Sequence, residues 1–220
     1  MTIREKVLGP EHPDTATSLN SLAYVLHAQQ GDLAAARPLI ERAAAIREKV
    51  FGPEHPATAT SLNNLAFLLH DQGDLAAARP FYERALAIQE KALGPEHAET
   101  ATILNNLARL LNKSGHANDA EPLFRRSITI GEKALGRNHS RTQRFASQYA
   151  RLLLDTTRAA EALPLAQSAL ATHETTSGPN HPWTKDSARI TADALAALGR
   201  ADEAAALRAR YSLTGTAWPL

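Results

Sequence analysis

A short phrase recurs along this chain at nearly constant spacing. It reads Leu-Gly-Pro-Glu-His-Pro at residues 8–13 and returns, with changes, at residues 51–56, 93–97, 135–139 and 177–182. The glycines at 52, 94, 136 and 178 follow one another every 42 residues, whereas the step from Gly9 to Gly52 is 43 and has its extra residue within residues 28–30. Five copies in phase indicate one structural unit repeated along the chain.

The apolar residues inside one repeat have the period of an α-helix. In the second repeat, Leu62, Leu65, Ala66 and Leu69 follow the i, i+3, i+4, i+7 pattern of a helix with one buried face. A second helix carries one apolar stripe and an adjacent one, so it needs neighbours on two sides. The first stripe contains Leu75, Ala78, Tyr82 and Ala85, and the second contains Phe81, Ile88 and Ala92.

Helix-breaking residues separate these two helices and end the second one. Gly73 is predicted to break the first helix, and Asp74 to cap the next. Gly94 and Pro95 end the second helix, because glycine suits the left-handed position after a helix and proline blocks continuation. Pro80 falls within the second helix and recurs at 38, 122 and 164. This recurrence indicates either a shared kink or a tolerated position near the helix start.

Together these patterns predict an all-α fold, a right-handed α-solenoid of five helix-turn-helix repeats. The predicted boundaries are 9–51, 52–93, 94–135, 136–177 and 178–211, followed by a tail over 212–220. Residues 1–8 nearly repeat residues 44–51, which predicts the last turns of a preceding second helix whose first helix is missing. We therefore expect an uncapped stack end that exposes apolar surface.

The repeat resembles the tetratricopeptide repeat in its spacing of small and large residues. The positions that carry the resemblance are Leu62, Leu65, Ala66, Leu69, Ala78, Tyr82 and Ala85. The repeat is more similar to the kinesin-light-chain type in two respects. One is its 42-residue length, and the other is the sequence motif Gly-Pro-Glu-His-Pro-x-Thr-Ala-Thr-Ser-Leu-Asn-Asn-Leu-Ala. The fourth repeat departs from it, with Thr157 at the mid-hairpin glycine and Ser147-Gln148 at the paired asparagines, and the fifth has Arg189-Ile190 there.

The resemblance implies that the first helix of each repeat lines a concave groove. It places asparagines at or near the floor of that groove, at Asn20, Asn63, Asn64, Asn105 and Asn106. Because an asparagine side chain carries one acceptor and two donor hydrogens, a ladder of them can bind an extended peptide backbone. The alternative is that these amides bond only to neighbouring helices or to water.

One further position on the same face changes character along the chain. It holds Tyr24, Phe67, Arg109, Arg151 and Asp193 in successive repeats, and Arg144 lies one turn before Arg151. The groove is thus predicted to run from aromatic to basic, which favours an extended ligand with apolar and acidic residues. The alternative is an ordinary solvated charged face.

Other functions have less support in the sequence. The nine histidines include one per repeat in the same turn, and repeats translate such residues apart, so we predict that they bond the local backbone and hold no metal. No catalytic or cofactor-binding motif occurs, so we expect neither enzymatic activity nor a cofactor. The net charge of +1 and the lack of interleaved aromatics argue against nucleic acid.

The chain is therefore predicted to be a non-enzymatic scaffold that binds a protein or peptide. We expect a cytoplasmic protein without a membrane span, since no run of 18 apolar residues occurs. The alternative function is an architectural or self-associating module of a larger signalling protein, which could form a homodimer through the open N-terminal end.

Overall fold

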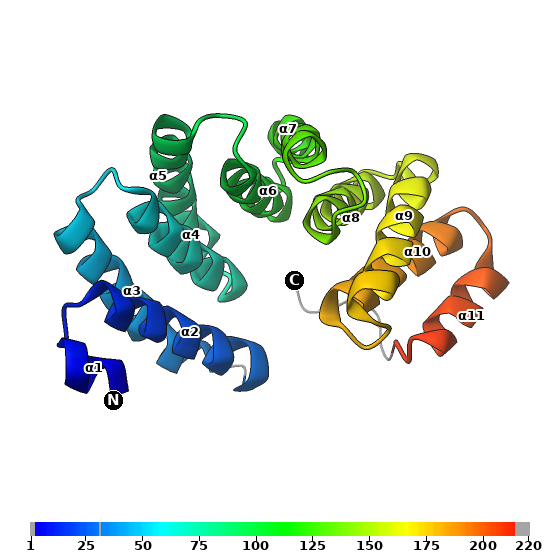
Figure 1. Ribbon diagram of the computed structural model, residues 1–220. Helices are drawn as coiled ribbons and strands as arrows, with labels where there is room; N and C mark the ends of the chain where they lie inside the picture. The colour runs from blue at the N-terminus through cyan, green and yellow to red at the C-terminus, as the bar shows by residue number, and fades with distance from the viewer. Residues whose placement is uncertain (1–2, 31, 214–220) are drawn as a thin grey trace. The chain divides into compact units, whose positions relative to one another are not determined.

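The structure is a computed structural model that describes residues 3–30 and 32–213. These residues form helices joined by short turns, with no strand among them, so the prediction of an all-α helical-repeat fold is confirmed (Figure 1). The helices are α1 (Ile3–Leu8), α2 (Pro13–Gln30), α3 (Leu33–Phe51), α4 (Pro56–Asp71), α5 (Leu75–Leu93), α6 (Ala98–Lys113), α7 (Ala117–Ala134), α8 (Ser140–Asp155), α9 (Ala159–Ser177), α10 (Pro182–Ala197) and α11 (Ala201–Arg210). We call α2, α4, α6, α8 and α10 the first helices, and α3, α5, α7, α9 and α11 the second helices. No helix of the described ranges combines the length and hydropathy that crossing a membrane requires.

The chain divides into two compact units, Met1–Leu110 and Leu111–Leu220, with the division inside α6. In unit 1, α2 packs on α3, α3 on α4, and α4 on α5, while α1 contacts α2. In unit 2, α8 packs on α7 and α9, and α10 packs on α8, α9 and α11. Each of these helices therefore packs against a neighbour in sequence, as in a repeat array.

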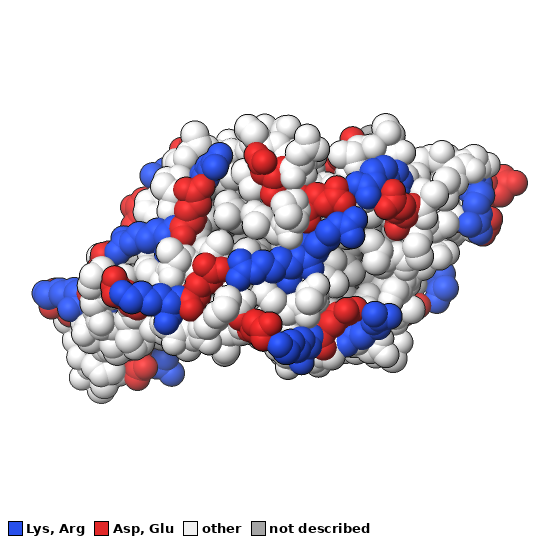
Figure 2. Space-filling model, turned by 90° about the horizontal axis from the view of Figure 1, so that it is seen from above, with Lys and Arg blue, Asp and Glu red and all other residues white. Residues whose placement is uncertain are grey.

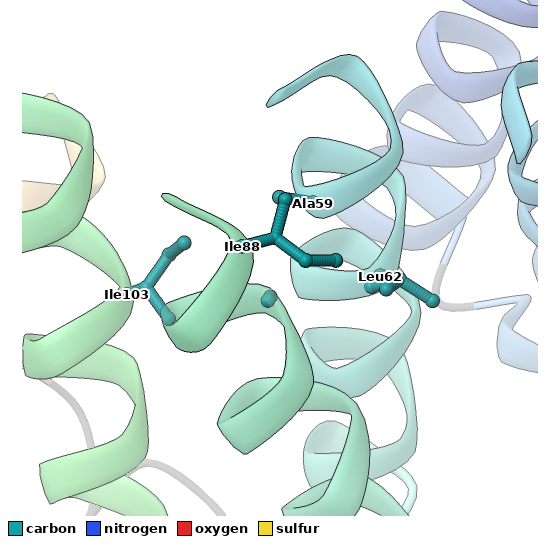
Figure 3. Packing of buried hydrophobic residues seen from close by; sticks show 5 residues of the cluster. Ala59, Leu62, Ile88 and Ile103 are labelled. Atoms are coloured by element: carbon teal, nitrogen blue, oxygen red, sulfur yellow. The ribbon is translucent and has the colours of Figure 1, made fainter. Parts of the chain in front are cut away.

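Alanine, leucine and isoleucine fill the core of unit 1. One cluster joins Ala59 and Leu62 of α4 to Ile88 of α5 and Ile103 of α6, and Figure 3 shows Ile88 between Leu62 and Ile103. The small alanine side chains let the helix backbones approach closely. Most of the predicted stripe is buried, including Leu65, Leu69 and the fully enclosed Tyr82. Ala92 is an exception and is exposed, because it lies in the last turn of α5.

The recurring turn phrase owes its residues to hydrogen bonds at the start of each first helix. In unit 1, the Nδ1 atom of His55 accepts a hydrogen bond from the backbone N–H of Ala57 at 3.0 Å, and Thr58 Oγ1 donates to the carbonyl of Gly52 at 2.8 Å. Histidines 12, 97, 139 and 181 repeat the first bond at 3.1–3.2 Å. The prediction that these histidines bond the local backbone is confirmed.

The predicted helix stops are present, with one correction. Asp74 caps α5 by accepting from Ala77 N, and Gly73 has a positive φ of 85°. Gly94 also has a positive φ, of 95°, but its ψ of 158° is extended and not left-handed helical. The reason is Pro95, because a residue before proline is pushed to an extended ψ. Pro80 lies inside α5, which begins at Leu75, and its counterparts occupy α3, α7 and α9.

Thr157 occupies the mid-hairpin position that glycine holds in other repeats. Its φ is +62°, close to the values of 85°, 82° and 77° at Gly73, Gly115 and Gly199. The turn geometry is therefore kept although the glycine is lost, and a β-branched residue adopts a conformation that it normally avoids.

At the N-terminal end, residues 3–8 form helix α1, and residues 1–2 lie outside the described ranges, as do 214–220 of the predicted tail. Leu22 stands at the position in its repeat that Leu65 and Leu107 occupy in theirs, yet it is 41% exposed while they are 6% exposed. In the described chain the six-residue α1 stands before the α2–α3 hairpin, whereas complete hairpins stand before α4 and α6.

Candidate functional site

The predicted site residues all lie on first helices. α2 carries Asn20 and Tyr24, α4 carries Asn63, Asn64 and Phe67, α6 carries Asn105, Asn106 and Arg109, and α8 carries Arg144 and Arg151. Those on α2, α4 and α6 belong to unit 1, and those on α8 to unit 2.

Asparagine amides link successive first helices in unit 1. Asn106 Nδ2 donates to Asn63 Oδ1 at 3.0 Å, and Asn63 Nδ2 donates to Asn64 Oδ1 at 3.5 Å. On the other side of α4, Asn20 Nδ2 donates to Ser61 Oγ at 3.4 Å. Side-chain amides of these asparagines therefore form hydrogen bonds between neighbouring first helices.

The asparagines differ in how far a ligand could reach them. Asn105 is buried, with 4% of its surface exposed, and its Oδ1 atom has no hydrogen-bond partner among the described residues. Asn106 is also buried, whereas Asn20, Asn63 and Asn64 are half-buried. Of the two half-buried asparagines of α4, Asn63 is bonded to Asn106, whereas Asn64 accepts only the long bond from Asn63 and its amide hydrogens make no bond in the described chain.

Aromatic side chains lie on the same helices. Tyr24 is 68% exposed, while Phe67 is half-buried. The imidazole of His27 meets the Phe67 ring edge-on at a centroid distance of 5.6 Å, and Arg109 Cζ lies 5.7 Å from the same ring centroid. His27 Nε2 is 2.9 Å from an Asp71 carboxylate oxygen. This part of unit 1 thus combines an apolar surface with cation–π stacking.

The two predicted arginines of unit 2 are each paired with a carboxylate of the next first helix. Arg144 forms an ion pair with Asp186, and Arg151 Nη1 lies 2.9 Å from Asp193 Oδ2. Asp193 also forms an ion pair with Arg208, whose Nη2 atom lies 2.9 Å from Asp193 Oδ1. The predicted basic stretch is therefore neutralised within the protein, and an acidic ligand at Arg144 or Arg151 has to replace these partners.

Sequence reasoning missed an arginine on a second helix. Arg47 of α3 reaches between α2 and α4, where it donates to Thr17 Oγ1 at 3.2 Å, Ser61 Oγ at 3.1 Å and the Ala57 carbonyl at 3.4 Å. Burial lowers the pKa of Arg47 from its ordinary value. Gln89, Gly131 and His173 stand at the same position of the later repeats, so no arginine recurs there after Arg47.

Cations of the second helices pair with carboxylates of the preceding second helix or of the turn that follows it. In unit 1, Arg84 bonds Glu48 and Lys91 bonds Glu54, each at 2.6 Å. Figure 2 shows Lys and Arg interleaved with Asp and Glu across the face that it presents. Such mixed surfaces keep a protein solvated and focus no field of a single sign.

Two further features of the structure bear on where a site could lie. A hollow of about 490 Å³ in unit 2 lies between α9, α10 and α11, and none of the predicted site residues lines it. Within the described ranges, no group of three or more His, Asp or Glu side chains is arranged to hold a metal ion.

Comparisons with known proteins agree with the fold. Family models described as tetratricopeptide repeat match residues 25–91, 58–133 and 147–182. A crystal structure of nearly identical tetratricopeptide-like repeats of a kinesin-light-chain-like protein from Podosopora anserina is 28% identical. It covers 92% of this chain and 95% of its own, with a TM-score of 0.69. A crystal structure of a variant of the same repeats is also 28% identical, covers 91% of this chain and 94% of its own, and has a TM-score of 0.70.

A third solved structure is more distant. BtubC (BKLC) from P. vanneervenii is 19% identical, covers 100% of this chain and 96% of its own, and has a TM-score of 0.64. At this identity it shows the fold alone. A search of curated protein sequences finds no significant match.

Proposed function

Because this chain belongs to the tetratricopeptide repeat family, with repeats similar to those of kinesin-light-chain-like proteins, we propose that it is a non-enzymatic scaffold that binds an extended peptide along its first helices. The family supports a protein partner. We place the peptide on α2, α4 and α6 of unit 1, and we expect the protein to work in the cytoplasm without a cofactor.

The observation that carries this proposal is the surface formed by Tyr24, Phe67 and Asn64. Tyr24 is largely exposed, although an aromatic ring in water gains stability by being covered. Phe67 occupies the position in the second repeat that Tyr24 occupies in the first. Phe67 follows Thr60 by seven residues, and Tyr24 follows Thr17 by seven residues. Packed helices lie about 8–10 Å apart, and an extended peptide rises about 3.3 Å per residue. Successive first helices therefore match every third residue or so of an extended ligand.

The chemistry of the ligand follows from the groups around this surface. Tyr24 and Phe67 favour an apolar side chain, and Asn64 can donate to a peptide carbonyl. Arg109, stacked on Phe67, adds positive charge for an acidic residue. Because Arg144 and Arg151 have aspartate partners, we assign them a smaller share of the recognition than the sequence suggested.

A matched set of variants tests this proposal. A pull-down followed by peptide arrays would supply a binding sequence, and fluorescence anisotropy would measure its affinity. We expect Tyr24→Ala and Asn64→Ala each to weaken binding about five- to thirtyfold, equivalent to roughly 1–2 kcal/mol. Val50→Ala, on the exposed face of α3, is the control and should bind as the wild type does. A peptide whose affinity is unchanged in both variants binds elsewhere.

One observation favours self-association as a second function. Ile3 and Val7 of α1 are 82% and 74% exposed, and Leu22 and Val25 of α2 are also exposed. Exposed apolar side chains gathered at one end are typical of an interaction surface. Sedimentation at increasing concentration decides between the two: a dimer that Val7→Asp and Leu22→Asp dissociate, and that excludes the array peptide, supports self-association over peptide binding.

A further inference from the structure

Arg47 differs from four other arginines of unit 1 in the chemistry of its partners. Arg37, Arg42, Arg79 and Arg84 each pair with a glutamate. Arg47 instead donates to two hydroxyl oxygens and one backbone carbonyl, and no carboxylate is among its partners in the described chain. Neutral oxygens position a guanidinium without cancelling its charge.

The position of Arg47 makes this unusual. Its side chain is half-buried, and it lies between two helices. Taking a charge partly out of water costs free energy that only an opposite charge recovers well. Burial lowers its pKa, but an arginine remains protonated at neutral pH. A cation is thus held at the α2–α4 joint without a counterion from the described residues of unit 1.

The hydrogen-bonding capacity of the guanidinium is also unfilled. It has five N–H groups, and three are used by the Ala57 carbonyl, Ser61 Oγ and Thr17 Oγ1. Nε and one hydrogen of Nη2 have no acceptor among the described residues. Thr17, whose hydroxyl oxygen accepts the hydrogen bond from Nη2, is exposed. Ser61, whose hydroxyl oxygen accepts the hydrogen bond from Nη1, is fully buried. The Nη2 side of the group therefore lies toward solvent.

Thr17 connects this group to the proposed peptide surface. On α2, Thr17, Asn20 and Tyr24 follow the i, i+3, i+7 spacing, so they share one face of the helix. Seven residues of helix rise about 10 Å, which is close to three residues of an extended peptide. Tyr24 and Thr17 thus lie about 10 Å apart along α2, so a ligand that crosses the first helices at Tyr24 reaches Thr17 with a segment, about three residues long, that turns along α2.

We propose that Arg47, with Thr17 at its rim, forms a binding site for one carboxylate of the peptide ligand at the α2–α4 joint. Two unused N–H groups match the two oxygens of a carboxylate in a bidentate pair. The carboxylate comes from an acidic side chain or from a peptide C-terminus. Gln89, Gly131 and His173 replace Arg47 in the later repeats, so these repeats lack the site, whereas Arg4 of α1 stands at the corresponding position before it. Its role in the ligand's recognition rests on the proposed function.

Small carboxylates test the site without a known partner. The probes are N-acetylglutamate α-amide, which has only a side-chain carboxylate, and N-acetylalanine, which has only a terminal one. N-acetylglutamine α-amide, which has neither, is the matched control. Nitrogen–proton correlation spectra report on the Arg47 Nε–H and on the backbone amides of Thr17 and Ser61. We expect saturable shifts with dissociation constants on the order of 10 mM for a carboxylate probe and none for the control.

Two variants separate the site from bulk charge. Arg47→Gln should abolish the shifts at Thr17 and Ser61, while Arg37→Gln, with the same charge change on the same helix, should keep them. If Arg47→Gln does not fold, Arg47→Lys replaces it and should weaken binding at least threefold by losing the planar two-point contact. The more tightly bound probe identifies the source of the carboxylate.

The result that overturns the proposal is the absence of saturable shifts at these amides in the wild type, or equal shifts with the neutral control. Survival of the shifts in Arg47→Gln overturns it as well. Because these probes need no peptide, a positive titration alongside empty peptide arrays would reject the peptide scaffold and keep the carboxylate site. If the small carboxylates do not bind and Glu→Gln changes in a peptide ligand leave its affinity unchanged, the carboxylate site is rejected and the peptide scaffold is kept.

Discussion

Asn106 donates a hydrogen bond of 3.0 Å from its Nδ2 atom to Oδ1 of Asn63, which joins α6 to α4. Asn106 lies 43 residues after Asn63, so the bond links neighbouring positions of two successive first helices. The recurrent asparagine pair therefore has a structural task within unit 1, whatever it does for a ligand.

The first prediction concerns that bond. Asn63→Ala and Asn106→Ala should each lower the free energy of unfolding by about 1 kcal/mol, because each leaves a partly buried amide without its partner. The double variant should lose less than the sum of the two, with a coupling energy of about 0.5–1 kcal/mol. Urea denaturation of the four proteins measures the cycle. Strict additivity would show that the bond contributes nothing in solution.

The second prediction compares two leucines at equivalent positions. Leu65→Asp should destabilise the protein by about 3 kcal/mol or more, since it places an unpaired charge in a packed interface. Leu22→Asp should cost less than about 1 kcal/mol, because Leu22 is 41% exposed. Thermal melting followed by circular dichroism distinguishes them. An unchanged melting temperature for Leu65→Asp would refute the packing of α4.

The third prediction concerns Thr157, whose φ is +62°. Thr157→Gly should raise the free energy of unfolding by about 1 kcal/mol, because glycine adopts a positive φ without the steric cost that a β-branched side chain meets. The reverse change in the preceding hairpin, Gly115→Thr, should destabilise by a similar amount. Urea titrations test both. If Thr157→Gly is neutral or destabilising, the positive φ carries no strain.

The fourth prediction concerns pH and Glu121. Its carboxylate accepts from Tyr149 OH at 2.7 Å and from Arg158 and Arg125 at 2.8 Å, and these bonds lower its pKa to about 2. A carboxyl whose pKa is depressed on folding stabilises the protein above its unfolded pKa of about 4.5. That contribution is lost as the pH falls from about 4.5 toward 2.

Melting temperatures at about pH 6, 4 and 3 check this dependence. The wild type should lose more of its melting temperature between the highest and the lowest of these pH values than Glu121→Gln, which has no carboxylate to protonate. Glu83→Gln, at an exposed pair with Arg79, is the control and should follow the wild type. Parallel curves for wild type and Glu121→Gln would show that the Glu121 cluster is not coupled to folding.

The sequence was sufficient for features that local chemistry determines. Apolar spacing in Leu62, Leu65 and Leu69 predicted a buried helix face, and a turn histidine such as His55 could be assigned to its own backbone. Both follow from residues within a few positions of one another. The prediction for Ala92 was wrong, and Leu22 is exposed although its counterparts Leu65 and Leu107 are buried. Periodicity says which face a residue shares, not whether another helix covers it.

The candidate site was harder to predict because its partners lie one repeat away. Arg151 was expected to face a ligand, yet Asp193, at the same position of the next repeat, reaches it at 2.9 Å. Arg47 was not predicted because it belongs to a second helix and its counterparts in the later repeats, Gln89, Gly131 and His173, are not arginines. A search for opposite charges 42 residues apart would have found the first pair, but nothing in the sequence marks the neutral partners of Arg47.

The interactions between successive first helices join residues that are close in sequence, and this affects how the chain folds. Asp71 follows its partner His27 by only 44 residues, and Asn106 follows Asn63 by 43. Contacts of such low sequence separation close small loops, so the entropic barrier to folding is modest and the transition state can form at more than one place. Folding should start in any adjacent pair of hairpins and spread to its neighbours. A hairpin inserted or deleted in register has only its two flanking interfaces to rebuild.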